Sequence, residues 1–85
     1  MEQTYTVMNP SGIHARPANL IMDAALQFTS AVTVRTTTKT ANAKSIVSLL
    51  KLGARMGDQV TVSAEGEDAE QAIRAIGEII GSNVE

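Results

Sequence analysis

The sequence predicts an α+β domain, an open-faced β-sandwich in which three helices cover one face of a four-stranded, mostly antiparallel sheet. Segments that alternate apolar and polar residues are interleaved with segments of helical periodicity, in the order β-α-β-β-α-β-α. Each expected strand has one polar face and each expected helix one apolar stripe, so both are buried only when the helices lie on one side of the sheet. A chain of 85 residues is long enough for one core, and we expect one domain over residues 1–85.

The first strand and helix follow from the N-terminal segment. Residues 3 to 8 alternate Tyr5 and Val7 with threonines, which is typical of a half-buried strand, and the Asn-Pro-Ser-Gly run at 9–12 ends it. Pro17 lacks an amide donor and is tolerated only in the first turn of a helix, so the helix should begin near His14. Its apolar residues recur at helical spacing: Leu20, Ile21, Ala24, Ala25 and Phe28.

A hairpin is expected next. Val32 and Val34 alternate with polar residues, the run at 36–39 supplies a turn, and residues 40–42 return as a shorter strand.

A short second helix is expected over residues 46–52. Ser45 is a favoured N-cap and Gly53 a natural residue to end the helix. The segment has more apolar surface than one buried stripe requires: Ile46, Leu49 and Leu50 should fill one face, whereas Val47 and Leu52 should point away from it. Two interpretations stay open: the helix sinks deeply into the core, or it offers a partner-binding patch formed by Ile46, Val47 and Leu50 beside Lys44 and Lys51.

The last strand and helix complete the order. Val60, Val62 and Ala64 alternate with polar residues, and Asp68 with Gln71 three positions on resembles a capping box. One face of the third helix is expected to be apolar: Ala69, Ala72, Ile73, Ile76, Ile79, Ile80 and Val84.

Composition narrows the class of protein. The chain has two aromatic residues and no cysteine, so the core must be aliphatic, and a thiolate metal site is excluded. The N-terminal residues are polar and no apolar stretch approaches ~20 residues, which argues against secretion and membrane insertion, so we expect a cytoplasmic protein. A net charge of -2 and the lack of stacking aromatics also argue against nucleic-acid binding.

Charge is divided along the chain. Cations prevail from His14 to Arg55, and acidic residues prevail from Asp58 onward. This division indicates either a basic face for an acidic partner or ordinary solvated charge, and the sequence leaves both open.

The chemistry of the chain centres on His14, its only histidine. A second imidazole for a metal is lacking, and Asp23 would lie about 14 Å further along the helix, which excludes a local relay. The surroundings suit an anion, because Gly12 permits tight backbone geometry, the first helical amides are unsatisfied donors, and Arg16 adds a permanent charge. A phosphoryl group on the imidazole would be stabilised there and could be transferred, although such a pattern alone also fits an ordinary surface histidine.

The segment Ser11-Gly12-Ile13-His14-Ala15-Arg16-Pro17-Ala18 resembles the active-site motif of HPr, the histidine-containing phosphocarrier of the phosphoenolpyruvate-dependent sugar phosphotransferase system. Chain length and element order match as well. The resemblance implies that His14 takes a phosphoryl group on Nδ1 from enzyme I and passes it to sugar-specific enzyme IIA domains, with Arg16 neutralising its charge. It implies a stoichiometric carrier and not a stand-alone enzyme, and we expect a monomer with no cofactor and no metal.

A second segment, Asn42-Ala43-Lys44-Ser45-Ile46, is similar to the part of many Gram-positive HPr proteins where an ATP-dependent HPr kinase/phosphorylase modifies the serine. The resemblance implies regulatory phosphorylation at Ser45, although an N-cap role alone would explain the residue. Val47 and Leu50 stand where the Gram-positive pattern has methionines, Ser48 replaces a glycine, and Thr36 to Thr38 replace a glycine-containing turn. These departures could alter the preference for partners without affecting phosphorylation of His14, and the sequence does not decide whether they do.

Two other functions remain as alternatives. In the first, the chain is a binding module whose Ser45-phosphorylated form serves a transcription regulator; the presence of His14 argues against a purely regulatory role. In the second, it is a phosphocarrier of nitrogen-linked signalling, whose members share the Gly-x-His-Ala-Arg-Pro motif; the Asn-Ala-Lys-Ser segment favours the sugar system.

Overall fold

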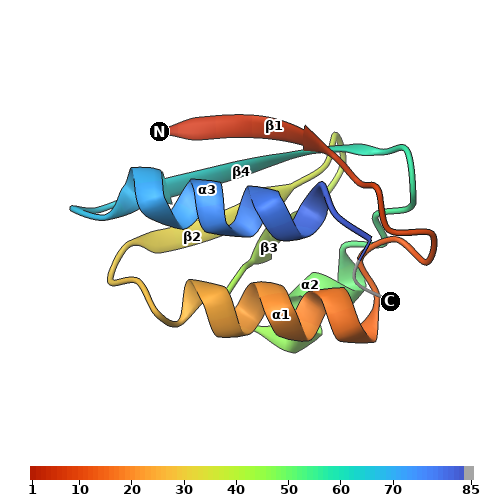
Figure 1. Cartoon of the computed structure of the whole chain (residues 1–85), viewed down its shortest axis with the longest axis horizontal. Coiled ribbons are helices and arrows are strands. Elements are labelled where there is room, and N and C mark those ends of the chain that lie inside the picture. Colours follow the sequence, from red (N-terminus) through yellow and green to blue (C-terminus); the bar gives the residue numbers. More distant parts are fainter. Residues whose placement is uncertain (84–85) are drawn as a thin grey trace.

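The computed structural model describes residues 1–83 and has the predicted order of elements (Figure 1). They are β1 (Glu2–Thr6), α1 (Ala15–Ala25), β2 (Ala31–Arg35), β3 (Thr40–Asn42), α2 (Ile46–Lys51), β4 (Gln59–Glu65) and α3 (Ala69–Ile80). The four strands form one sheet in the order β1-β4-β2-β3, and every neighbouring pair is antiparallel. The predicted α+β open-faced sandwich is therefore confirmed.

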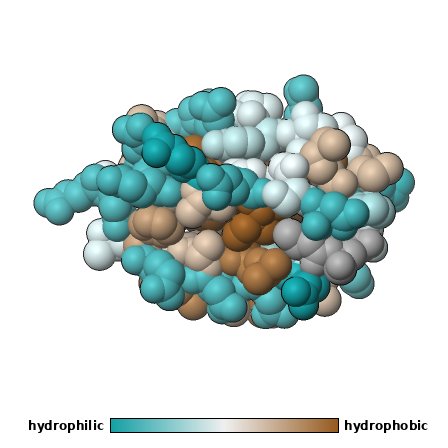
Figure 2. Space-filling model, in the orientation of Figure 1, coloured by the Kyte–Doolittle hydropathy of each residue, from teal (hydrophilic) through white to brown (hydrophobic). Residues whose placement is uncertain are grey.

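The helices cover one face of the sheet. Val32 and Val34 of β2 and Val60 and Val62 of β4 point to that face and are buried, which confirms the alternation expected of half-buried strands. Figure 1 shows α1 and α3 side by side in front of the sheet. In the same view, apolar side chains gather at the seam between these two helices, with hydrophilic ones around them (Figure 2).

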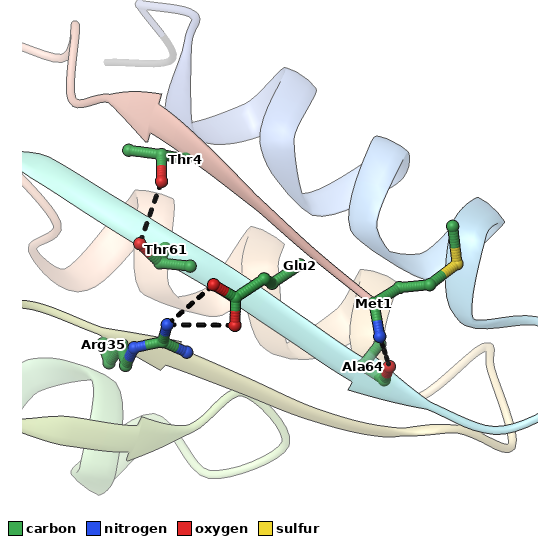
Figure 3. A network of polar contacts seen from close by, with 6 residues as sticks. All are labelled: Met1, Glu2, Thr4, Arg35, Thr61 and Ala64. Carbon is green, nitrogen blue, oxygen red and sulfur yellow. Dashed lines mark hydrogen bonds and ion pairs between the residues drawn. The ribbon is translucent and has the colours of Figure 1, made fainter.

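The opposite face of the sheet is polar. The hydroxyls of Thr4 and Thr61 share a hydrogen bond of 3.0 Å between β1 and β4, and Arg35 of β2 forms an ion pair with Glu2 of β1 at 2.9 Å (Figure 3). The Arg35–Glu2 pair crosses the intervening strand β4, so polar side chains link three strands on this side.

The first helix is shorter than its apolar pattern. α1 ends at Ala25 with Leu26 as C-cap, so Phe28 lies beyond the helix, where it is half-buried against the core. The predicted start near His14 is confirmed, since His14 is the N-cap and Pro17 lies in the first turn.

The predicted capping box of the third helix is wrong. Asp68 is the N-cap of α3, but its side chain makes no capping hydrogen bond. Its carboxylate instead accepts hydrogen bonds from the amides of Thr29, at 2.9 Å, and Ser30, at 3.0 Å, and from the Ser30 hydroxyl. These bonds, with that of the Ser30 side chain the largest contribution, lower the pKa of Asp68 to about 2.

The predicted apolar face of the third helix is confirmed over most of its length. Ala69, Ala72, Ile73, Ile76 and Ile80 are buried, and Ile79 is half-buried. Val84, which we expected on the same face, lies outside the described residues. Within residues 1–83, none of the helices combines the length and apolar character needed to cross a membrane.

Candidate functional site

His14 lies exposed at the start of α1. As N-cap it has an extended backbone conformation, with φ -112° and ψ -160°. Its carbonyl accepts a hydrogen bond from the amide of Ala18 at 2.8 Å, and its own amide donates to the carbonyl of Gly12 at 3.1 Å. The backbone of His14 is thus held on both sides while the imidazole faces solvent.

The loop before His14 is closed by Asn9, which is buried. The side-chain Nδ2 of Asn9 donates to the carbonyl of Gly12 at 3.1 Å, and the amide of Gly12 donates to the carbonyl of Asn9 at 2.8 Å. This reciprocal pair satisfies buried polar groups that would otherwise destabilise the loop. Asn9 therefore fixes the turn that delivers the chain to His14.

Gly12 makes a close approach that no other residue would permit. Its φ is +71°, and a Cβ built on it would lie 2.3 Å from the carbonyl oxygen of Ala54 and 2.9 Å from the Cα of Arg55. The next residue, Ile13, is buried and donates its amide to the same Ala54 carbonyl at 3.0 Å. The loop that carries His14 is therefore seated on the segment after α2.

The start of α1 offers a positive electrostatic environment. The amides of Ala15 and Arg16 precede the first intrahelical hydrogen bond, which Ala18 donates, and Pro17 has no amide to satisfy. The side chain of Arg16 is exposed, and the first turn of α1 carries no acidic residue. His14 and Arg16 therefore both lie exposed at the start of α1, where a negatively charged group would be stabilised.

Ser45 is the N-cap of α2, as the sequence predicted. Its hydroxyl oxygen accepts a hydrogen bond from the amide of Ser48 at 3.3 Å. The preceding residue, Lys44, donates its Nζ to the carbonyl of Phe28 at 2.9 Å, which ties the beginning of α2 to the segment after α1.

Helix α2 contacts α1, and the two ends of α2 adjoin different segments of the chain. Ser45 and Lys44 lie at the end near Phe28, whereas the other end leads through Gly53 to Ala54, which contacts Gly12 and Ile13. The structure thus places Lys51 and Leu50 toward the His14 end of α2 and places Ser45 at its far end.

Two leucines of α2 and its C-cap, Leu50 and Leu52, differ in burial from the sequence prediction. Leu49 and Leu52 are buried, whereas Val47 is 57% exposed and Leu50 is 41% exposed. Leu52 follows Leu49 by three positions and so shares its buried face, while Val47 and Leu50 are related in the same way on the outer face. The prediction that Leu50 lies with Leu49 and that Leu52 points outward was wrong; Ile46 is half-buried against the core and Lys51 is exposed.

The segment 54–58 is a part of the site that the sequence did not reveal. Arg55 was noticeable only as one cation in the charge pattern, and no local motif marks it as a neighbour of Gly12.

The acidic run at 65–70 lies at the opposite end of the molecule from the start of α1 (Figure 1). Within residues 1–83, no group of three His, Cys, Asp or Glu side chains could hold a metal ion.

Comparison with known proteins identifies consistent relatives. The family model described as the PTS HPr component phosphorylation site matches residues 1–82. Phosphocarrier protein HPr of Lysinibacillus sphaericus is 45% identical over 78 residues, which cover 92% of this chain and 89% of that protein. The multiphosphoryl transfer protein of Salmonella typhimurium is 39% identical over 83 residues, and these cover 94% of this chain but only 22% of that longer protein.

A solved structure of an HPr protein has the same fold as this chain. The crystal structure of HPr-C-His from Thermoanaerobacter tengcongensis superposes with a TM-score of 0.89 at 42% sequence identity. The match covers 94% of this chain and 90% of that one.

Proposed function

Because the chain belongs to the HPr family of the phosphotransferase system, we propose that it accepts a phosphoryl group on His14 from enzyme I and passes it to sugar-specific enzyme IIA domains. The observation that supports this most directly is the exposed imidazole at the N-cap of α1, beside Arg16 and without an acid in the first turn.

The transfer needs positioning and charge stabilisation more than it needs further reactive groups. The lone pair of Nδ1 attacks phosphorus as the bond to the donor breaks, and the other ring nitrogen keeps its proton. The amides at the start of α1 and the guanidinium of Arg16 then stabilise the negative charge. A nucleophile on the partner takes the group by the same step in reverse, so the chain is a carrier and not a stand-alone enzyme.

The partner-binding patch, called the docking patch from here on, consists of Val47 and Leu50 of α2 with the half-buried Ile46, and we propose that it binds these partners. Lys44 and Lys51 supply positive charge at its two ends. Two exposed aliphatic side chains with flanking cations suit a small, short-lived interface, in which charge guides the encounter and apolar contact holds it briefly.

Ser45 is the proposed regulatory site, phosphorylated by an ATP-dependent HPr kinase/phosphorylase. Its N-cap position would place the new charge beside the first amides of α2, so the fold should accept it. Because Ser45 lies at the far end of α2 from His14, its phosphate should act on docking partners, among them a transcription regulator, and not on the imidazole itself.

Residues 1–85 are proposed to form one domain that works as a monomer in the cytoplasm, without a cofactor. The Asn-Ala-Lys-Ser segment supports the sugar system over nitrogen-linked signalling, and the exposure of His14 supports a carrier over a module that only binds.

The test is to incubate the protein with phosphoenolpyruvate and purified enzyme I and to measure bound phosphate before and after acid treatment. Phosphate on histidine is lost in acid, whereas phosphate on serine stays. We expect acid-labile phosphate on the parent and on Ser45→Ala, and none on His14→Ala. Acid-labile phosphate on His14→Ala, or none on the parent, would refute the proposal.

A further inference from the structure

The backbone of a second arginine, Arg55, contacts the loop that carries His14, although the two are far apart in sequence. A Cβ on Gly12 would lie 2.9 Å from the Cα of Arg55, which places these two backbones in direct contact. The hydrogen bond from the amide of Ile13 to the carbonyl of Ala54 holds the same two segments together on the next residue. Arg55 is thus anchored beside a residue that is two positions from His14.

The backbone of Arg55 is further fixed by Asp58. The amide of Arg55 donates to Oδ2 of Asp58 at 2.9 Å, and the amide of Asp58 donates to the carbonyl of Arg55 at 3.0 Å. The nearest acidic side chain is therefore engaged by the main chain of the turn and not by the guanidinium. These two hydrogen bonds fix the position of the Arg55 backbone within the 54–58 turn.

The charge of Arg55 is available at the surface. Its side chain is exposed, and the ion pairs within residues 1–83 join Arg35 to Glu2 and Arg74 to Glu70. Asp58 reduces the local positive potential but does not form an ion pair with Arg55 in the described part of the chain.

We propose that Arg55 is a second positive charge at the His14 phosphoryl site, supplied by the 54–58 turn and acting with Arg16. The inference rests on the proposed function, because it needs a phosphoryl group on His14. Arg16 follows His14 in α1, and the backbone of Arg55 contacts the loop before His14, so a phosphoryl group on the imidazole would have its dianionic form stabilised by both charges. Arg55 is a positioning and charge-stabilising residue, and the imidazole remains the reacting group.

The test uses the phosphorylated protein alone, so that partner binding does not enter. Phosphoramidate phosphorylates the imidazole without enzyme I: a new P–N bond forms to His14, the bond to the amino group of phosphoramidate breaks, and ammonia leaves with the proton. The pKa of the second ionisation of the phosphoryl group is then followed by the pH dependence of its phosphorus NMR shift.

Loss of a nearby cation disfavours the dianion, so Arg55→Ala should raise this pKa, by about 0.4 units for a charge about 7 Å away in water. Arg55→Lys should keep the parent value. Arg74→Ala is the matched control, since it removes the same charge from α3, where Arg74 pairs with Glu70, and it should leave the pKa unchanged. Thermal melts of all variants establish that each is folded.

Failure of this inference and failure of the proposed function give different results. A phosphoryl pKa in folded Arg55→Ala equal to that of the parent overturns the role of Arg55, whatever enzyme I does. Enzyme I could fail to phosphorylate the parent while Arg55→Ala still raises the pKa of the phosphoryl group. In that case the proposed function is refuted and the role of Arg55 is supported. If neither phosphoramidate nor enzyme I produces phosphohistidine on the parent, both are refuted; if enzyme I alone does, the protein that it phosphorylates is used for the pKa measurement.

Discussion

Asp68 and Ser30, which are 38 positions apart, are joined twice: the carboxylate of Asp68 accepts hydrogen bonds from both the amide and the hydroxyl of Ser30. Ser30 is almost fully buried, and a Cβ on Gly66 would lie 2.8 Å from its Cα, so the connection before β2 is fixed against the turn before α3.

This contact predicts a specific acid dependence of stability. Because the pKa of Asp68 is lowered from 3.8 to about 2 in the folded protein, its contribution is fully present above about pH 4 and is lost as pH falls toward 2. Urea unfolding of the parent should therefore show a falling free energy of unfolding between these pH values. Asp68→Asn, which cannot ionise, should be less stable at pH 6, and its free energy of unfolding should change less between about pH 4 and pH 2. If the free energy of unfolding of both proteins falls equally with pH, Asp68 is not the source of the acid dependence.

The ring of Tyr5 lies against Gly77 of α3. A Cβ on Gly77 would be 2.0 Å from Cζ of Tyr5, so Gly77→Ala forces the ring or the helix to move. We expect a loss of about 1–3 kcal/mol in the free energy of unfolding, despite the better helix propensity of alanine. Adding Tyr5→Leu to Gly77→Ala should cost less than the sum of the two single changes. Additive effects would show that the ring is not the obstacle.

Gly12 and Gly53 provide a matched pair for testing the loop that carries His14. Both have positive φ, +71° and +69°, but a Cβ on Gly12 meets Ala54 at 2.3 Å, whereas a Cβ on Gly53 meets nothing within 4 Å. Gly53→Ala should cost about 1 kcal/mol of stability and leave phosphoryl uptake intact. Gly12→Ala should cost more and slow uptake at His14. Similar uptake by both variants would show that the seating of the loop on Ala54 does not govern the site.

Arg16→Ala should remain able to take up phosphate, but more slowly. One charge-assisted hydrogen bond contributes about 1.5–3 kcal/mol, so its loss from the transition state corresponds to about 10–150-fold in rate, while the amides at the start of α1 remain. The measurement is the initial rate of transfer from phosphorylated enzyme I. A rate equal to that of the parent would mean that Arg16 is only a solvated charge.

Phosphorylation of Ser45 should slow transfer to His14 without lowering the melting temperature. The phosphate would lie beside the first amides of α2 and next to the docking patch, so it should favour the helix while opposing an acidic or apolar partner. Enzymatically phosphorylated protein is compared with unmodified protein in the enzyme I reaction and in thermal melts. Equal transfer rates would refute partner blocking, and a markedly lower melting temperature would refute the N-cap argument.

Features set by neighbouring residues could be predicted from the sequence, and features set by distant ones could not. The strand alternation around Val62, the cap at Ser45 and the helix start at His14 depend on short segments, and each was predicted. The capping box was wrong because the partner of Asp68 lies 38 positions away, and Arg55 was missed because it meets Gly12 across 43 positions. On α2, Leu50 and Leu52 were misplaced because in a six-residue helix the core packing decides which face is buried.

The central position of β4 has a consequence for how the chain folds. β1 and β2 each pair with β4 and not with each other, so the first strand gains its sheet partner only when residues 59–65 are available. During synthesis, residues 2–6 therefore leave the ribosome with their sheet hydrogen bonds unmade, and about 60 more residues must follow before the ladder can close. Closing that long loop early is entropically costly, so formation of the β1–β4 pair should be a late, rate-limiting event in folding.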